Sequence, residues 1–213
     1  MNIKDFYSFG SKLLSTTFQA HAENLTLDKS HNLILGVFDN IDFPVVFRQE
    51  YGKKLTDMLD TGFVSLFLIS DKMLRVLKEN KITGWKTYPV KVYDKKGNEV
   101  EDYHGFSITG RSGPINYDKS EIIEKQLAPE GPPSKYYKGR YFGYEKWDGS
   151  DFFIPEGTFY IIVTKKVVQA FKKAKLTNIR FECLTDIETM GIIVEQTLKK
   201  KKSIIKRLFG LGK

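Results

Sequence analysis

Two stretches of the chain share one pattern: FLISDKMLRVLKENKITGW at residues 67–85 and IIVTKKVVQAFKKAKLTNI at residues 161–179. A constant offset of 94 residues aligns them without a gap. Each contains an apolar run, a hydroxyl residue, an amphipathic segment, a stop and a second apolar run. This order predicts a strand, a helix and a strand in each stretch, and we expect the rest of the chain to be organised around these two units.

Matching positions in the two stretches carry residues that begin and end helices. Ser70 and Thr164 stand at the expected N-cap, where a hydroxyl oxygen can accept a hydrogen bond from a free backbone amide. Gly84 and Asn178 close the two segments, and both residue types tolerate a positive φ. The shared register indicates either duplication of one unit or convergence on one strand–helix–strand pattern.

Length and composition favour a globular protein with a substantial core. The chain has 213 residues, of which 41% are hydrophobic and 28% are charged. We predict an α+β fold in which two related strand–helix–strand halves lie on an antiparallel or mixed sheet. The Pro- and Gly-rich segment at 126–135 is the predicted boundary between the halves. The predicted parts are an N-terminal half at 1–125 with the first unit at 64–93, a C-terminal half at 136–198 with the second unit at 159–184, and a basic amphipathic tail at 199–213.

The positive charge of the chain is concentrated in that tail. The formal net charge is +8, but residues 199–213 hold seven of the 34 basic residues and no acidic residue. The remainder has 27 basic and 26 acidic residues, so a nucleic-acid partner is disfavoured. An amphipathic basic segment is typical of a helix on an anionic membrane, although the same composition also fits a solubilising terminus. The residues predicted to contact an anionic surface are Lys199, Lys200, Lys201, Lys202, Lys206 and Arg207.

Two local patterns predict further elements in the N-terminal half. Apolar residues alternate with other residues across 33–37, which predicts a strand. Apolar residues at helical spacing across 55–59 precede Gly62, which predicts a short helix that ends at this glycine.

Residues 136–153, YYKGRYFGYEKWDGSDFF, combine aromatic side chains with charges and glycine turns. Tyrosine and tryptophan among charged residues are typical of binding hot spots. The same alternation would also place aromatic rings on the core face of a hairpin, so both interpretations stay open. The predicted partner-binding residues are Tyr141, Tyr144, Trp147, Asp148 and Asp151.

Catalytic and metal-binding motifs do not stand out in this sequence. His104 with Asp148 and Asp151 is a set that an unrecognised hydrolase or transferase could use, which makes an enzyme the leading alternative. His21 and His31 have no cysteine or glutamate at a ligand spacing beside them. We therefore predict no enzyme activity, no cofactor and no metal site.

Three stretches together carry a family resemblance: FLISDKMLRVLKENKITGWKTYPV (67–90), INYDKSE (115–121) and FYIIVTKKVVQAFKKAKLTNIRFECL (159–184). With Asp118 and Ser120 between the two units, this pattern resembles a family of bacterial immunity proteins of polymorphic toxin systems, over about residues 64–188. The resemblance implies a cytosolic protein that neutralises a toxin domain by occluding it, without a cofactor or catalysis. It assigns no binding residues.

We therefore predict a cytoplasmic protein–protein interaction module whose partner is a cognate toxin domain or another protein. A peripheral membrane protein anchored by residues 199–213 is a further alternative. The sequence leaves open the identity of the toxin and the oligomeric state.

Overall fold

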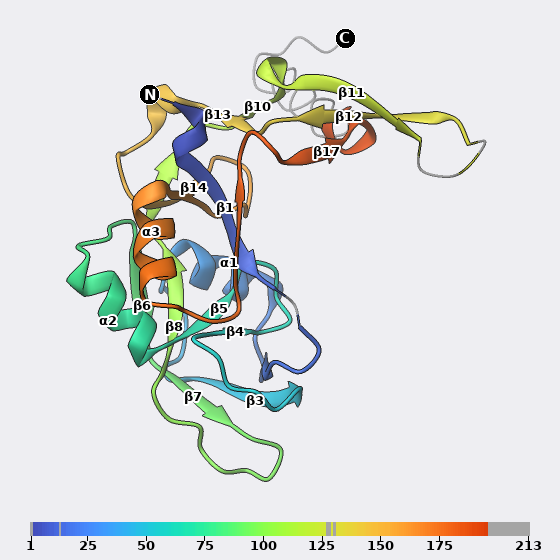
Figure 1. Cartoon of the computed structure of the whole chain (residues 1–213). Coiled ribbons are helices and arrows are strands. Elements are labelled where there is room, and N and C mark those ends of the chain that lie inside the picture. Colours follow the sequence, from blue (N-terminus) through green and yellow to red (C-terminus); the bar gives the residue numbers. More distant parts are fainter. Residues whose placement is uncertain (1, 13, 127–128, 130, 196–213) are drawn as a thin grey trace, which may run out of the picture.

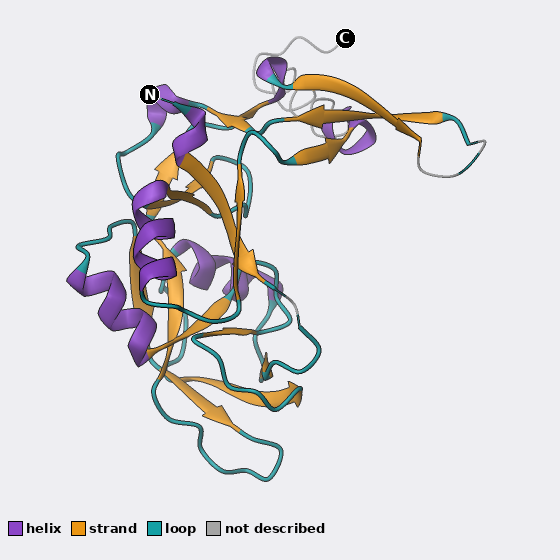
Figure 2. Cartoon of the chain, viewed as in Figure 1, coloured by secondary structure: helices purple, strands orange, loops and turns teal. Residues whose placement is uncertain are grey.

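The computed structural model describes residues 2–12, 14–126, 129 and 131–195, and shows an α+β protein with mixed sheets (Figures 1 and 2). Two sheets form the body. The first has the strand order β6-β8-β5-β4-β2-β3-β7 and the second has the order β16-β1-β15-β14-β9. In this order, the strands of the first sheet are β6 (Trp85–Tyr88), β8 (Tyr103–Ile108), β5 (Phe67–Ser70), β4 (Met58–Asp60), β2 (Gln19–Ala22), β3 (Val45–Tyr51) and β7 (Val90–Tyr93). The strands of the second sheet are β16 (Ile179–Cys183), β1 (Phe6–Ser11), β15 (Ile162–Thr164), β14 (Phe152–Pro155) and β9 (Gly110–Ser112).

The two predicted helices occupy matching positions after β5 and β15. They are α2 (Asp71–Glu79) and α3 (Lys165–Lys173). The hydroxyl of Ser70 accepts a hydrogen bond from the backbone amide of Met73 at 3.2 Å, as expected for an N-cap. Thr164 also stands at the N-cap of its helix; its hydroxyl makes no capping bond and donates to a carboxylate described below.

Both helices are followed by the same turn. Gly84 and Asn178 have φ values of 84° and 60°, which confirms the prediction that these positions are left-handed. Three residues earlier, Lys81 and Lys175 also have positive φ, at 47° and 52°. The turns therefore match in backbone conformation as well as in length.

The two body sheets also correspond strand by strand. At the 94-residue offset, the order β4-β5-α2-β6 in the first half matches β14-β15-α3-β16 in the second. In the first sheet β8 lies antiparallel between β5 and β6, and in the second sheet β1 lies antiparallel between β15 and β16. The central strand of the second half thus comes from the N-terminal end of the chain.

Each central strand then continues into the sheet of the other half. The chain runs from β1 into β2, which pairs in parallel with β4 of the first half. It runs from β8 into β9, which pairs in parallel with β14 of the second half. This strand exchange ties the two halves together through the backbone.

A single aromatic core joins the exchanged sheets. Phe9 of β1 contacts Phe67 of β5 and Phe152 of β14, with ring centroids 6.0 and 5.2 Å apart and nearly perpendicular ring planes. Phe106 of β8 meets Phe152 at 5.4 Å in the same way. Edge-to-face pairs of this kind are favourable beyond the area that they bury. The two halves therefore share one core.

The strand predicted at 33–37 is wrong, because this part of the chain lies at the end of a helix. Helix α1 (Leu27–Leu35) begins after Thr26, whose hydroxyl accepts a hydrogen bond from the amide of Lys29 at 3.3 Å. It ends at Gly36, which has a φ of 72°. These two caps favour a helix, and they outweigh the short alternation of apolar residues that predicted a strand.

The helix predicted at 55–59 is also wrong, since Met58–Asp60 forms the short strand β4. All three residues of β4 are buried, because the strand lies inside the sheet between β2 and β5. A strand that is covered on both faces loses the alternation that would have identified it in the sequence.

A smaller three-stranded sheet extends from the body as an arm (Figure 1). The segment at 126–135 connects two of its strands. The described residues also form a two-stranded pair, three 3₁₀ turns and a helical segment at 191–195. None of the described helices has the length and apolar character needed to cross a membrane. The arm contains β11 (Glu121–Gln126), β12 (Pro133–Lys138) and β17 (Glu188–Met190), the pair is β10 (Ile115–Asn116) with β13 (Tyr141–Phe142), and the turns are η1 (Ile3–Asp5), η2 (Tyr117–Lys119) and η3 (Tyr144–Lys146).

Candidate partner-binding site

An aromatic cluster lies where the N-terminus meets the segment that follows the arm. Phe6 is 1% exposed and stands at its centre. The rings of Phe142, Trp147 and Phe153 approach Phe6 edge to face, with centroids 5.1, 5.4 and 5.9 Å away. These contacts fix the ring positions, so the residues around Phe6 form a rigid platform.

Two of the predicted binding residues line a pocket on this platform. The pocket has a volume of about 460 Å³, and its walls include Tyr141, Tyr144 and Phe6. Tyr144 is 42% exposed, while its ring remains 6.3 Å from that of Phe6. The remaining lining residues are Asn2, Ile3, Lys119 and Phe142. We call this site the aromatic pocket.

Trp147 supports the aromatic pocket from behind. Its indole N–H donates a hydrogen bond to the carbonyl oxygen of Ser150 at 3.2 Å, and its ring packs on Phe6. The tryptophan is half-buried, so it serves both interpretations that the sequence left open: part of its ring fills the platform and part reaches the surface.

Asp148 is exposed, and its carboxylate holds the adjoining turn. It accepts hydrogen bonds from the amide of Arg111 at 2.8 Å and from the amide of Ser150 at 3.0 Å. Partial burial alone would raise the pKa of Asp148, but the bonds from the Ser150 hydroxyl and amide, then from Arg111, bring the pKa below its usual value. Asp148 is therefore charged at neutral pH, which suits a binding contact and does not suit a general acid.

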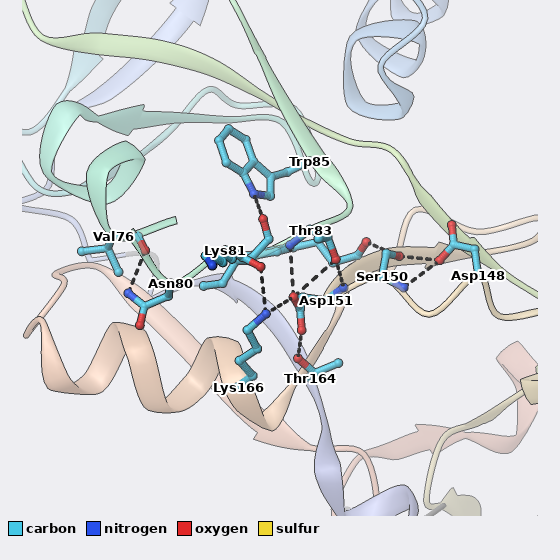
Figure 3. A network of polar contacts seen from close by, with 12 residues as sticks. Val76, Asn80, Lys81, Thr83, Trp85, Asp148, Ser150, Asp151, Thr164 and Lys166 are labelled. Atoms are coloured by element: carbon cyan, nitrogen blue, oxygen red, sulfur yellow. Dashed lines mark hydrogen bonds and ion pairs between the residues drawn. The ribbon is translucent and has the colours of Figure 1, made fainter. Parts of the chain in front are cut away.

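Asp151 lies in a different environment, at the junction of the two halves (Figure 3). It is 8% exposed. Its carboxylate accepts hydrogen bonds from the amide and hydroxyl of Thr83 at 3.1 and 3.3 Å, from the hydroxyl of Thr164 at 2.8 Å and from the ammonium of Lys166 at 2.8 Å. These internal contacts saturate the carboxylate, so Asp151 joins the first unit to the second and does not belong to the aromatic pocket.

Asp57 of the first half makes the same kind of contacts with the second half as Asp151 of the second half makes with the first. Its carboxylate accepts from the amide and hydroxyl of Thr177 at 2.8 and 2.7 Å and from the hydroxyl of Ser70 at 3.1 Å, and it pairs with the ammonium of Lys72 at 3.7 Å. Each of these residues is 94 positions from its counterpart around Asp151. Sequence reasoning missed this reciprocal junction, although the offset alone would have paired the two aspartates.

Of the three residues of the enzyme alternative, Asp148 and Asp151 belong to one polar network that runs through Ser150, Phe152 and Thr83, whereas His104 lies outside it (Figure 3). The Nε2 atom of His104 is 2.6 Å from the carboxylate of Asp71 at the start of α2. In the described part of the chain, none of the hydrogen bonds or ion pairs links His104 to Asp148 or Asp151. The described residues also contain no group of three His, Cys, Asp or Glu side chains that could hold a metal ion.

The second predicted contact surface is the basic tail. Residues 199–213 lie outside the described residues, so the prediction of an anionic-surface contact stays a prediction. It concerns Lys199, Lys200, Lys201, Lys202, Lys206 and Arg207.

Comparison with known proteins gives one match. The model of the immunity protein family Imm11 matches residues 19–186, a span that includes both strand–helix–strand units and the aromatic segment of the pocket. No curated protein matches the chain. Since the match covers well over half of the sequence, the chain belongs to the Imm11 immunity protein family.

Proposed function

We propose that this protein is the cytoplasmic immunity protein of a polymorphic toxin system and neutralises its cognate toxin domain by occluding it. Membership of the immunity protein family supports this proposal. The observation that carries it further is the aromatic pocket, in which the exposed Tyr144 stands on rings that are already fixed. A rigid aromatic surface loses little conformational entropy when a partner binds.

The aromatic pocket fits a protruding apolar or aromatic side chain of the toxin. Tyr141, Tyr144 and Phe6 supply aromatic rings, while Asn2 and Lys119 supply polar groups. Hot spots in protein interfaces are of this type, with aromatic anchors at the centre and polar groups around them.

We expect Tyr144→Ala to weaken toxin binding by about 2 kcal/mol, which raises the Kd about thirtyfold. The proposed function predicts that a neighbouring gene encodes a large secreted protein, and the C-terminal domain of that protein is the toxin to be used. Isothermal titration calorimetry gives the Kd, and growth of cells that produce the toxin domain gives protection.

The matched control is Tyr51→Ala, because Tyr51 is 58% exposed at the end of β3, far along the chain from the pocket. This variant should bind as the wild type does. Equal Kd values for Tyr144→Ala and the wild type would contradict the pocket as the binding site. Absence of binding by the wild-type protein would contradict the proposed function itself.

The proposed mechanism needs no catalysis by this chain. We therefore expect His104→Ala and Asp148→Asn to change protection in a graded way, through stability or binding only. Complete loss of protection by a variant that still binds the toxin domain would favour the enzyme alternative. Asp151 is unsuitable for this experiment, since its substitution would disturb the junction between the halves.

The basic segment at 199–213 bears on location. Each basic residue near an anionic membrane adds roughly 1 kcal/mol of attraction, so a membrane role predicts that the full chain sediments with phosphatidylserine vesicles and a chain lacking 199–213 does not. Equal partition of the two forms would leave the cytoplasmic assignment and remove the peripheral membrane alternative.

We also propose that the two halves arose by duplication of one unit. The support is the reciprocal junction, in which Asp57 and Asp151 make equivalent contacts with Thr177 and Thr83. Convergent packing of strands and helices explains matching elements, but it does not require matching side-chain contacts. Relatives in which each half resembles the other more closely would strengthen this proposal, and relatives that lack one aspartate of the pair would weaken it.

A further inference from the structure

Helices α2 and α3 lie on the same side of the molecule and run in opposite directions (Figure 1). Contacts at both ends hold them side by side. The ammonium of Lys166 in α3 donates to the carbonyl oxygen of Lys81 after α2 at 2.8 Å, and the ammonium of Lys72 in α2 donates to the carbonyl oxygen of Lys175 after α3 at 3.4 Å. The helix pair is therefore a fixed surface built from both halves.

The outer side of this pair is strongly basic. Between 71–81 and 165–175 the exposed residues include nine lysines and arginines but only two acids, Asp71 and Glu79. Asp71 is engaged by His104. Three of the lysines pair with carboxylates, and the other six basic residues have no ion pair among the described residues. These six, which we call the basic face, are Arg75, Lys78, Lys81, Lys172, Lys173 and Lys175.

This concentration of charge contrasts with the rest of the body. Outside the tail the chain is close to neutral, with 27 basic and 26 acidic residues. A surplus of positive charge on two helices therefore leaves a surplus of negative charge elsewhere on the body. Such an uneven distribution orients an approaching charged partner before contact.

We infer that the basic face receives an acidic surface of the toxin and steers its association, an inference that rests on the proposed function. Lysines dominate the basic face, and lysine is depleted at the centres of protein interfaces. The ammonium groups would therefore lie at the rim, where charges increase the association rate more than the affinity. The aromatic pocket would supply the anchoring contacts.

Other anionic partners fit the basic face less well. A membrane-binding helix inserts apolar side chains, but the apolar residues of these helices, such as Met73, Val76 and Phe171, are buried in the core. Nucleic-acid surfaces rely on arginine forks and stacked aromatic rings. The basic face has one arginine, and neither helix segment exposes an aromatic side chain.

Continuity with the aromatic pocket supports the same partner. Lys165, at the start of α3, pairs with Asp5 of the turn η1 at 3.7 Å. Ile3 of the same turn and Phe6, which follows Asp5, both line the pocket. A toxin domain seated on the aromatic pocket would therefore lie close to the N-terminal end of α3.

The test compares two variants with the same loss of charge. The first replaces four residues of the basic face by glutamine: Arg75→Gln, Lys78→Gln, Lys172→Gln and Lys173→Gln. The control replaces four exposed lysines outside the helix pair, near β3 and β7: Lys53→Gln, Lys91→Gln, Lys95→Gln and Lys96→Gln. Glutamine is a good helix former, and all the substituted residues of both variants are exposed, so circular dichroism should show wild-type folding for both variants.

The association rate constant of the neighbouring-gene toxin domain is measured by surface plasmon resonance at low salt. We expect the basic-face variant to associate about tenfold more slowly with a nearly unchanged dissociation rate, and the control to stay within about twofold of the wild type. About 0.3 M salt should remove the difference. Equal slowing of both variants, or slowing of neither, would overturn the inference while leaving the proposed function in place.

A second probe does not depend on the identity of the toxin. Poly-L-glutamate, added at low salt, should shift the amide NMR signals of 71–81 and 165–175 in the wild type and not in the basic-face variant. Shifts confined to other segments would overturn the inference. Tighter binding of a double-stranded DNA oligomer than of the toxin domain through the same four residues would overturn it as well.

Discussion

Asp151→Ala is expected to lower the free energy of unfolding by about 2 to 4 kcal/mol. The substitution removes the buried carboxylate that accepts four hydrogen bonds from Thr83, Thr164 and Lys166. The amide of Thr83 would then lack its acceptor at the junction of the halves, while the ammonium of Lys166 would keep the carbonyl oxygen of Lys81. Urea unfolding followed by circular dichroism measures the loss.

Asp57→Ala should cost a similar amount, because Asp57 makes the equivalent contacts with Thr177, Ser70 and Lys72. Asp118→Ala is the matched control: Asp118 is exposed, and its substitution should change the stability by no more than about 0.5 kcal/mol. A loss below about 1 kcal/mol for both buried aspartates would show that the reciprocal junction contributes little to folding.

Gly84→Ala is expected to destabilise the protein by more than about 3 kcal/mol, through backbone strain and overlap together. The φ of Gly84 is 84°, which an alanine adopts only with strain, and an added Cβ would lie 2.0 Å from the carbonyl oxygen of Phe152. That oxygen belongs to β14 of the other half, so relief of the overlap would require the two halves to separate locally.

Gly97→Ala is the control that measures backbone strain without steric overlap of the added Cβ. Gly97 has a φ of 86°, almost the same as Gly84, but an added Cβ would meet nothing within 4 Å. Its substitution should cost only about 1 kcal/mol, the effect of strain alone. If thermal unfolding showed equal losses for the two variants, the close approach of Gly84 to Phe152 would not be what makes glycine necessary there.

Comparison of the prediction with the fold shows that local signals located the units but not their connection. Ser70 marks the start of α2, and Gly84 and Asn178 mark the left-handed turns before β6 and β16, through their own backbone and side-chain chemistry, so the sequence predicts these positions directly. The place of β1 in the second sheet depends on pairing across more than 100 residues, for example between Tyr7 and Cys183. Nothing in the local pattern of β1 indicates which sheet it joins.

The candidate site was predictable only in part for the same reason. Aromatic composition indicated Tyr141 and Tyr144, which line the pocket. Phe6, at the centre of the platform, is separated from them by most of the chain, and a lone phenylalanine near an N-terminus carries no signal of its own. Asp151 resembled a surface carboxylate because it follows a glycine turn, whereas its burial depends on Thr83 of the other half.

The strand exchange has a consequence for protein synthesis. Phe6 is translated more than 150 residues before the strands that flank β1, because β1 acquires its neighbours β15 and β16 only after residues 162–183 have been translated. At about 5 to 20 residues per second, this delay lasts on the order of ten seconds. The strands on both sides of β1 are therefore missing from a nascent chain until the second strand–helix–strand unit has been translated.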